Sequence, residues 1–404
     1  YEKWLYSLNL GFQVPSSVFI DIPEIREVLD NNVPYVTNLS NKILINLLGL
    51  KDNITRESLI NYLVDIQKDI PPFKTILKIY NQLDQLQFVK KRVTNENPEY
   101  VLNTANAKLP SNLPYIMKVY KFKPQQYSYL AGNNAISEAE TLGFTNENLI
   151  SDLKGTEYKW RNSQYNSTLE IDINTRAIEL KTNMNGKSSY YSPRSLDTKI
   201  AVKLASEKLT SIYRFGDDLY PSGSQVVTFG YYANNRLIKT DDELEAQIAM
   251  VDFYRYIEKY PILGPNPYKG MLRIAVPRSP TTGILSNPIL EANFWEIETS
   301  TEATYPIIPI QEAWEAVKTN KGVIVGVKPN NLNPFETYVP TSADKILIDN
   351  IYLAYYETPE YQTYLQPIYV FSGKYTSKDS NGGGITLYFP AISGQWTKQS
   401  STSE

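Results

Sequence analysis

The chain has 404 residues with 42% hydrophobic and 21% charged content and a formal net charge of −3, a composition typical of a folded protein. Its 40 basic and 43 acidic residues are mixed along the sequence without a basic block, so nucleic acid is not an expected partner. Cysteine and histidine are absent, which excludes disulfides, thiolate metal sites and a histidine general base.

The segment 1–107 is predicted to be mainly helical, because its apolar residues recur at helical spacing between stop signals. Helices are expected over residues 23–29, 40–48, 55–70 and 73–93. The connections between them are short, so these helices should pack as antiparallel neighbours.

The segment 108–196 is predicted to be a first α+β unit. A helix over 135–142 is followed by runs that alternate between apolar and polar residues, which favours strands. The dipeptide Asn185–Gly186 predicts a tight hairpin that leads into a last strand over 188–192. The other strands are expected over 116–122, 158–162, 167–173 and 177–183.

The segment 197–305 is predicted to be a second unit of the same kind. It opens with a helix over 197–209, and residues 250–256 alternate strictly, which indicates a strand rather than a helix. Its strands are expected over 225–232, 236–239, 245–260, 271–276 and 284–299.

The segment 306–396 is predicted to be a third unit, and the polar residues 397–404 a flexible tail. A helix over 309–317 precedes strands over 323–327, 346–357, 367–375 and 385–390. The predicted fold class is therefore α+β, with an N-terminal helical region followed by about three units of one helix and an antiparallel meander.

Three stretches of the third segment carry a resemblance: PIIPIQEAWEAVKTNKGVIVGV, ILIDNIYLAYYETPEYQTYLQPIYVFSGK and ITLYFPAI. They look like the extracytoplasmic YycH/YycI-type and PepSY-like domains of bacteria, and are most similar to uncharacterised surface proteins of candidate-phyla (Patescibacteria-type) bacteria. KLPSNLPYIMKVYKFKP, AISEAETLGF and VDFYRYIEKYPILGPNP are similar to the same family, so the likeness covers roughly residues 108–392.

The resemblance implies PepSY-like units in an N-terminally anchored ectodomain, whose relatives by fold modulate sensor kinases or peptidases through protein contacts. It brings no catalytic residue and no cofactor. The chain starts at Tyr1 rather than Met and contains no run of about 20 apolar residues, so we expect a signal or anchor segment upstream of Tyr1. The expected location is extracytoplasmic, at the cell surface, with membrane contact only through that segment.

Two stretches match the S-x-x-K motif of serine acyl-enzymes, Ser151–Lys154 and Ser342–Lys345. That chemistry needs a helix start, so that the lysine faces the serine one turn later. Residue Lys345 instead leads into an expected strand, and the companion motifs are missing. We therefore expect no catalytic serine.

Clustered acidic residues occur at Asp217–Asp218 and at Asp241–Glu243. Oxygen ligands could hold a hard cation there, but the full calcium-loop pattern is absent, so solvated loop carboxylates are the favoured interpretation. The glycine run 382–384 enters a strand rather than a helix, so it predicts a hairpin tip and not a phosphate loop. No metal site and no cofactor is expected.

Tyrosine is abundant, with 32 residues against 13 phenylalanines. The groups Tyr190–Tyr191, Tyr231–Tyr232 and Tyr352 with Tyr355–Tyr356 suit either half-buried sheet faces, which we favour, or a ligand platform. We expect a non-catalytic surface protein, not an enzyme, that binds a protein partner or assembles with itself. A cell-wall or carbohydrate binder is the alternative, and a carboxylate-dependent hydrolase the third hypothesis.

Overall fold

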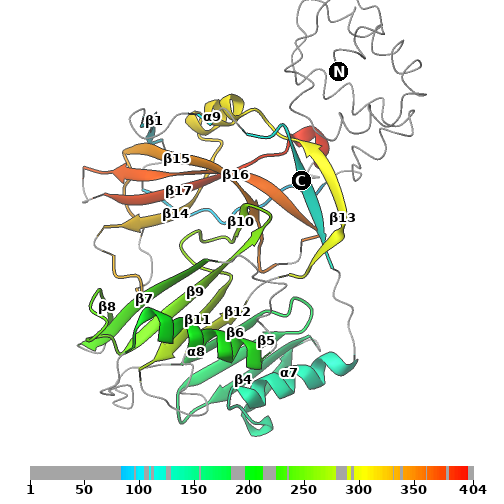
Figure 1. Cartoon of the computed structure of the whole chain (residues 1–404), viewed down its shortest axis with the longest axis vertical. Coiled ribbons are helices and arrows are strands. Elements are labelled where there is room, and N and C mark those ends of the chain that lie inside the picture. Colours follow the sequence, from blue (N-terminus) through cyan, green and yellow to red (C-terminus); the bar gives the residue numbers. More distant parts are fainter. Residues whose placement is uncertain are drawn as a thin grey trace, which may run out of the picture.

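The computed structural model describes residues 83–398, apart from gaps at 95–96, 104–108, 111–112, 124–128, 154–155, 183–195, 213–223, 234–235, 279–288, 293–294, 331, 337–339, 361 and 379–381 (Figure 1). The described residues form seventeen strands and three α-helices, so this part of the chain is mostly β. The predicted α+β fold class, with a helical N-terminal region and separate helix-plus-meander units, is therefore wrong. Strands from different segments pair with one another instead of closing separate units.

The helices expected within residues 1–82 lie outside the described residues. The described part of the fourth, residues 83–93, is extended and not helical. Leu83 is fully buried and bridges Thr397, and the backbone N–H of Lys91 donates to the carbonyl of Ile324 at 2.8 Å. These tertiary contacts along a sheet edge outweigh the local helical spacing.

One sheet, the helix-covered sheet, has nine antiparallel strands. Helices α7 (Tyr129–Thr141) and α8 (Thr198–Ser211) lie across one face of it, in the lower half of Figure 1. In spatial order, its strands are β3 (Leu149–Leu153), β4 (Glu157–Asn162), β5 (Ser167–Asp172), β6 (Ile178–Thr182), β12 (Ile289–Ala292), β11 (Leu272–Pro277), β9 (Ile248–Ile257), β7 (Ser224–Ala233) and β8 (Arg236–Thr240).

Alternation along the strands decides which face of this sheet is buried. In β5 and β6, Leu169 and Leu180 are fully buried against the helices, while Glu170 and Glu179 point to the opposite face. Helix α8 is capped by Asp197, whose carboxylate accepts the N–H of Ile200 at 2.7 Å. Its buried residues Ala201, Ala205 and Leu209 repeat every four positions and face the sheet.

A second sheet, the C-terminal sheet, contains the longest strands of the described chain. Helix α9 (Ile310–Lys318) packs on it through Trp314, whose ring stacks on Phe371 at 6.0 Å between centroids. Its central strands, in spatial order, are β14 (Val323–Pro329), β17 (Gly383–Pro390), β16 (Tyr364–Thr376) and β15 (Lys345–Tyr356). Two short strands, β1 (Glu99–Leu102) and β10 (Tyr260–Leu263), pair with β15 in parallel. Strand β2 (Ile116–Phe122) pairs with the start of β16 and with β13 (Ile297–Pro306).

Strand β9 belongs to both sheets. Its first part pairs with β7 and β11 in the helix-covered sheet, and its last residues pair with β10, which continues alongside β15. A tight turn joins β9 to β10, and Glu258 in that turn takes a φ of 52°. The two sheets are therefore joined by continuous backbone pairing, and not only by side-chain contact.

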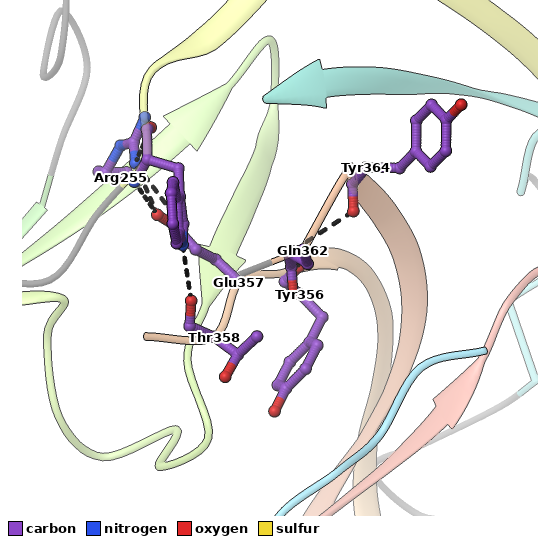
Figure 2. Close-up of polar contacts among 7 residues, drawn as sticks. Arg255, Tyr356, Glu357, Thr358, Gln362 and Tyr364 are labelled. Atoms are coloured by element: carbon purple, nitrogen blue, oxygen red, sulfur yellow. Dashed lines mark hydrogen bonds and ion pairs between the residues drawn. The ribbon is translucent and has the colours of Figure 1, made fainter. Parts of the chain in front are cut away.

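A buried ion pair lies where the two sheets meet (Figure 2). Arg255 of β9 is 4% exposed, Glu357 directly after β15 is 0% exposed, and the guanidinium Nη1 lies 3.0 Å from the carboxylate Oε2. The backbone of Trp295 joins both groups: its carbonyl accepts from Arg255 at 3.1 Å, and its N–H donates to Glu357 at 2.5 Å. Burial raises the pKa of Glu357 above its ordinary value, while the guanidinium of Arg255 lowers it.

Many of the individual elements expected from residue 116 onward are confirmed. Helices predicted over 135–142, 197–209 and 309–317 correspond to α7, α8 and α9. The long strand predicted over 284–299 is wrong, since β12 and β13 are separate strands of different sheets. The hairpin at Asn185–Gly186 lies outside the described residues, and the segment boundaries at 196, 305 and 396 stay predictions. None of the described helices is long and apolar enough to cross a bilayer.

Replacing Glu357 with alanine should lower the free energy of unfolding by about 3–5 kcal/mol, because it leaves the charge of Arg255 buried without a partner. Urea denaturation at neutral pH measures this change. Glu99→Ala is the control: Glu99 is 63% exposed and pairs with Lys345 at 3.3 Å, and its loss should cost less than about 1 kcal/mol. Equal losses for the two variants would contradict the structural importance of the buried pair.

Candidate functional site

The face of the helix-covered sheet that points away from α7 and α8 carries a row of charged side chains, here called the charged row. In register across neighbouring strands, Glu170 of β5 lies opposite Glu179 of β6, which lies opposite Glu291 of β12. The row continues through Arg273 of β11 to Asp252 of β9. Direct cross-strand partners lie roughly 5 Å apart, so these groups interact strongly.

Each carboxylate of the charged row lies beside a cation of its own. This arrangement relieves the repulsion that adjacent carboxylates would otherwise exert across the strands. The pairs are Glu170 with Lys159, Glu179 with Lys181, Glu291 with Lys269 and Asp252 with Arg273.

Asp252 is the buried end of the charged row, with 2% of its surface exposed. Its Oδ1 accepts the backbone N–H of Gly270 at 2.9 Å and lies 3.4 Å from Nε of Arg273. Burial raises the pKa of Asp252 above its ordinary value, while the charge of Arg273 and the Gly270 N–H lower it. Asp252 does not line the adjacent pocket, so its role is to hold Arg273 rather than to reach a ligand.

An apolar cluster lies beside the charged row on the same face. Ile248, Met250 and Ala275 are buried there. Tyr232, Leu237, Ile289 and Phe335 pack against them and are partly exposed. This apolar cluster gives the charged face a hydrophobic floor.

A turn over residues 333–336, which follows β14 of the C-terminal sheet, reaches over this floor. The side-chain amide of Asn333 donates to the carbonyl of Leu237 at 2.5 Å. The ring of Phe335 lies so close to Gly230 that a Cβ there would meet it at 2.8 Å, so glycine is needed for this contact. The turn therefore forms a roof that is held to β7 and β8.

Floor, charged row and roof enclose a pocket of about 1040 Å³, here called the mixed-charge pocket. Its lining combines cations and carboxylates with aromatic and aliphatic side chains, so it is more polar than a typical small-molecule pocket. The lining residues are Glu179, Lys181, Thr182, Tyr232, Arg236, Leu237, Met250, Lys269, Arg273, Ile289, Glu291, Pro334, Phe335 and Glu336.

The S-x-x-K motifs do not form a catalytic site. Lys345 begins β15 and pairs with Glu99 at 3.3 Å, so it does not face Ser342 from a helical turn. Ser151 lies in β3, and Lys154 lies outside the described residues.

The acidic cluster that the structure describes, Asp241–Glu243, makes local hydrogen bonds and an ion pair. Asp241 is 88% exposed and pairs with Lys239, Asp242 accepts the N–H of Leu244 at 2.8 Å, and Glu243 accepts the hydroxyl of Thr198 at 3.1 Å. Asp217–Asp218 lies outside the described residues. Among the residues that the structure describes, no three acidic side chains cluster as a metal site.

The glycine run precedes and enters β17, as the hairpin prediction requires. Gly382 has a φ of 66°, and a Cβ there would meet the carbonyl of Tyr375 at 2.5 Å. Only glycine adopts that conformation and approach without strain.

The tyrosine groups divide between core and site. Tyr355 and Tyr356 are 2% and 1% exposed, so they pack in the core rather than form a platform. The hydroxyl of Tyr355 donates to the carbonyl of Lys118 at 2.9 Å. Tyr232 lines the mixed-charge pocket, and Tyr190–Tyr191 lies outside the described residues.

The mixed-charge pocket was missed by reasoning from the sequence. The available signal was the presence of charged residues inside otherwise apolar strands, such as Asp252 in IAMVDFYRYI and Arg273 in LRIAVP. Strand pairing between distant segments, which the sequence pattern does not reveal, is what aligns them with Glu291.

Comparison with known proteins gives little guidance. No family model matches the chain, and no curated protein matches it. A crystal structure at 1.45 Å resolution of an uncharacterized protein from Eubacterium rectale ATCC 33656 is similar over 76% of this chain and 92% of that chain, with 15% identity and a TM-score of 0.39. A likeness of that size supports no inference about function.

The raised pKa of Asp252 predicts a pH dependence of stability. A carboxyl whose pKa is higher in the folded state adds stability below its unfolded pKa, near 3.9, and loses it as the pH rises through the folded value. The unfolding free energy of the wild type, relative to Asp252→Asn, should therefore fall as the pH is raised from about 4 towards neutrality.

Urea denaturation of both proteins across this pH range measures the difference. Asp241→Asn, which changes an exposed carboxylate, should give a flat difference and serves as the control. A wild-type advantage over Asp252→Asn that grows as the pH rises would contradict the prediction.

Proposed function

We propose that this chain is a non-catalytic interaction protein that binds an extended segment of a protein partner in the mixed-charge pocket. The observation that carries the proposal is the composition of the pocket: an apolar floor and roof beside carboxylates that are already ion-paired. Side chains of this kind can hold a ligand, but they do not provide a free acid and base for its conversion.

The size and shape of the pocket favour a peptide segment over a small metabolite. Its volume of about 1040 Å³ is at the upper end of ligand pockets, which hold roughly 300–1,000 Å³. Leu237, Phe335 and Ile289 offer apolar surface to the side chains of such a segment. Because Asn333 already bonds the carbonyl of Leu237 in β8, the segment would bind through its side chains rather than as an added strand.

The expected extracytoplasmic location is part of the same proposal and is tested separately, by fractionation of the cells that make the protein. Carbohydrate binding is the competing hypothesis, and a glycan array discriminates between the two. Binding to glycans in the absence of any peptide binding would favour the carbohydrate hypothesis and count against a protein partner.

Selection from a phage-displayed library of random dodecapeptides should enrich binders of the wild-type protein. Phe335→Ala should reduce this binding at least about tenfold, because it removes an aromatic group that packs over the floor. Leu244→Ala is the matched control, since Leu244 is an apolar residue that is 71% exposed and does not line the pocket.

Two results would contradict the proposal. One is a library from which the wild type enriches nothing. The other is equal binding by wild type and Phe335→Ala, with both proteins folded by circular dichroism. Light scattering of the purified protein additionally shows whether the segment that it binds belongs to a second copy of this chain.

A further inference from the structure

We infer that the segment bound in the mixed-charge pocket is acidic, and that Arg273 binds a carboxylate of that segment while Arg236 attracts it at the rim. This inference rests on the proposed function and goes beyond it by assigning the chemistry of the ligand.

The deepest charge of the pocket is Arg273. Its side chain is only 17% exposed. In the sheet, Arg273 lies between Glu291 of β12 and Asp252 of β9, its cross-strand partners. Oδ1 of Asp252 lies 3.4 Å from Nε of the guanidinium, an ion-pair contact without a hydrogen bond, so charge attraction favours this position of the side chain. No residue in the described part of the chain accepts a hydrogen bond from its two terminal amino groups.

A guanidinium with free terminal amino groups is a ready partner for a carboxylate. Its planar fork matches the two oxygens of a carboxylate and can donate two parallel hydrogen bonds. A partly buried site makes these charge-assisted bonds stronger than they are in water. Because Asp252 already orients Arg273, little side-chain freedom is lost when a ligand binds.

Apart from Arg273, the cations and carboxylates of the lining balance in number, so Arg273 supplies its excess positive charge. Lys181 and Lys269 are engaged by Glu179 and Glu291, so these two pairs attract neither sign strongly. Arg236 at the start of β8 is exposed, and no described residue pairs with it. The lining as a whole contains four cations and three carboxylates. The cations are Lys181, Arg236, Lys269 and Arg273, and the carboxylates are Glu179, Glu291 and Glu336.

Carboxylates around Arg273 set the upper limit of the ligand's charge. Glu291 and Asp252 lie opposite Arg273 on its two neighbouring strands, and Glu179 follows Glu291 along the charged row. A single carboxylate can reach the guanidinium with modest repulsion from these groups. For a phosphate, with a charge near −2 at neutral pH, attraction and repulsion both double, whereas the cost of removing the charge from water rises about fourfold. The inferred ligand group is therefore an Asp or Glu side chain, or a chain-terminal carboxylate.

The test uses the same random dodecapeptide library with a different readout. Peptides enriched by the wild-type protein should contain more Asp and Glu than the unselected library. In a synthetic copy of an enriched peptide, exchange of the critical Glu or Asp for its amide should weaken binding roughly tenfold or more, measured by fluorescence anisotropy. Raising the salt concentration should weaken binding of the acidic peptide but not of its amide form.

Variants of the protein identify the binding group. Arg273→Lys keeps a cation beside Asp252 but loses the fork, so it should remove most of the preference for the acidic peptide over its amide form. Arg236→Gln should weaken binding only a few-fold and reduce its salt dependence, because Arg236 lies at the rim. If Arg273→Lys does not fold, the amide exchange in the peptide and Arg236→Gln still decide the question.

The outcomes separate this inference from the proposed function. If the wild type enriches no peptide, the proposed function fails, and this inference fails with it. If peptides bind but are neutral or basic, or if Arg273→Lys keeps the full preference for the acidic form, only the acidic assignment is overturned. Tighter binding of a phosphoserine peptide than of its Glu counterpart would also overturn the choice of a carboxylate.

Discussion

The buried ion pair between Arg255 and Glu357 is the interaction on which the arrangement of the two sheets depends. Both groups are removed from water, so each is tolerated only while the other remains beside it, and the backbone of Trp295 bonds to both. Arg255 lies in the end of β9 that pairs with β10, and Glu357 directly follows β15, so the pair lies at the junction where β9 passes from one sheet to the other. The floor of the mixed-charge pocket belongs to the helix-covered sheet. Its roof, which includes Phe335, belongs to the segment after β14 of the C-terminal sheet. The shape of the pocket therefore depends on how the two sheets are joined.

Local elements of the fold were predictable, and their arrangement was not. The N-cap Asp197 and the spacing of Ala201, Ala205 and Leu209 suffice to predict α8, because capping and helical periodicity act within a few residues. The segment 83–93 has helical spacing as well, yet it is extended, because its neighbours along a sheet edge satisfy its backbone groups. Pairing between strands such as β6 and β12 depends on tertiary contacts that alternation alone does not encode.

The candidate site shows the same limit more strongly. The motif Ser342–Lys345 is contiguous in the chain, and it lies where the chain enters β15. The charged row instead takes one residue from each of several strands, and its members, from Glu170 to Glu291, are up to 121 positions apart in the chain. What the sequence does show is a charge such as Asp252 within an apolar strand, and burial makes such a charge costly unless a partner lies beside it.

Parallel pairing of β1 with β15 has a consequence for how the protein is made. Glu99 and Lys345, which pair across these strands, are separated by 246 positions in the chain. During synthesis, β1 and β2 therefore leave the ribosome long before β15 and β16, the strands that cover them, exist. The early strands stay exposed for most of that time, and a chain dominated by such distant contacts closes slowly. A truncation that removes β15 would leave this edge of β1 without its partner.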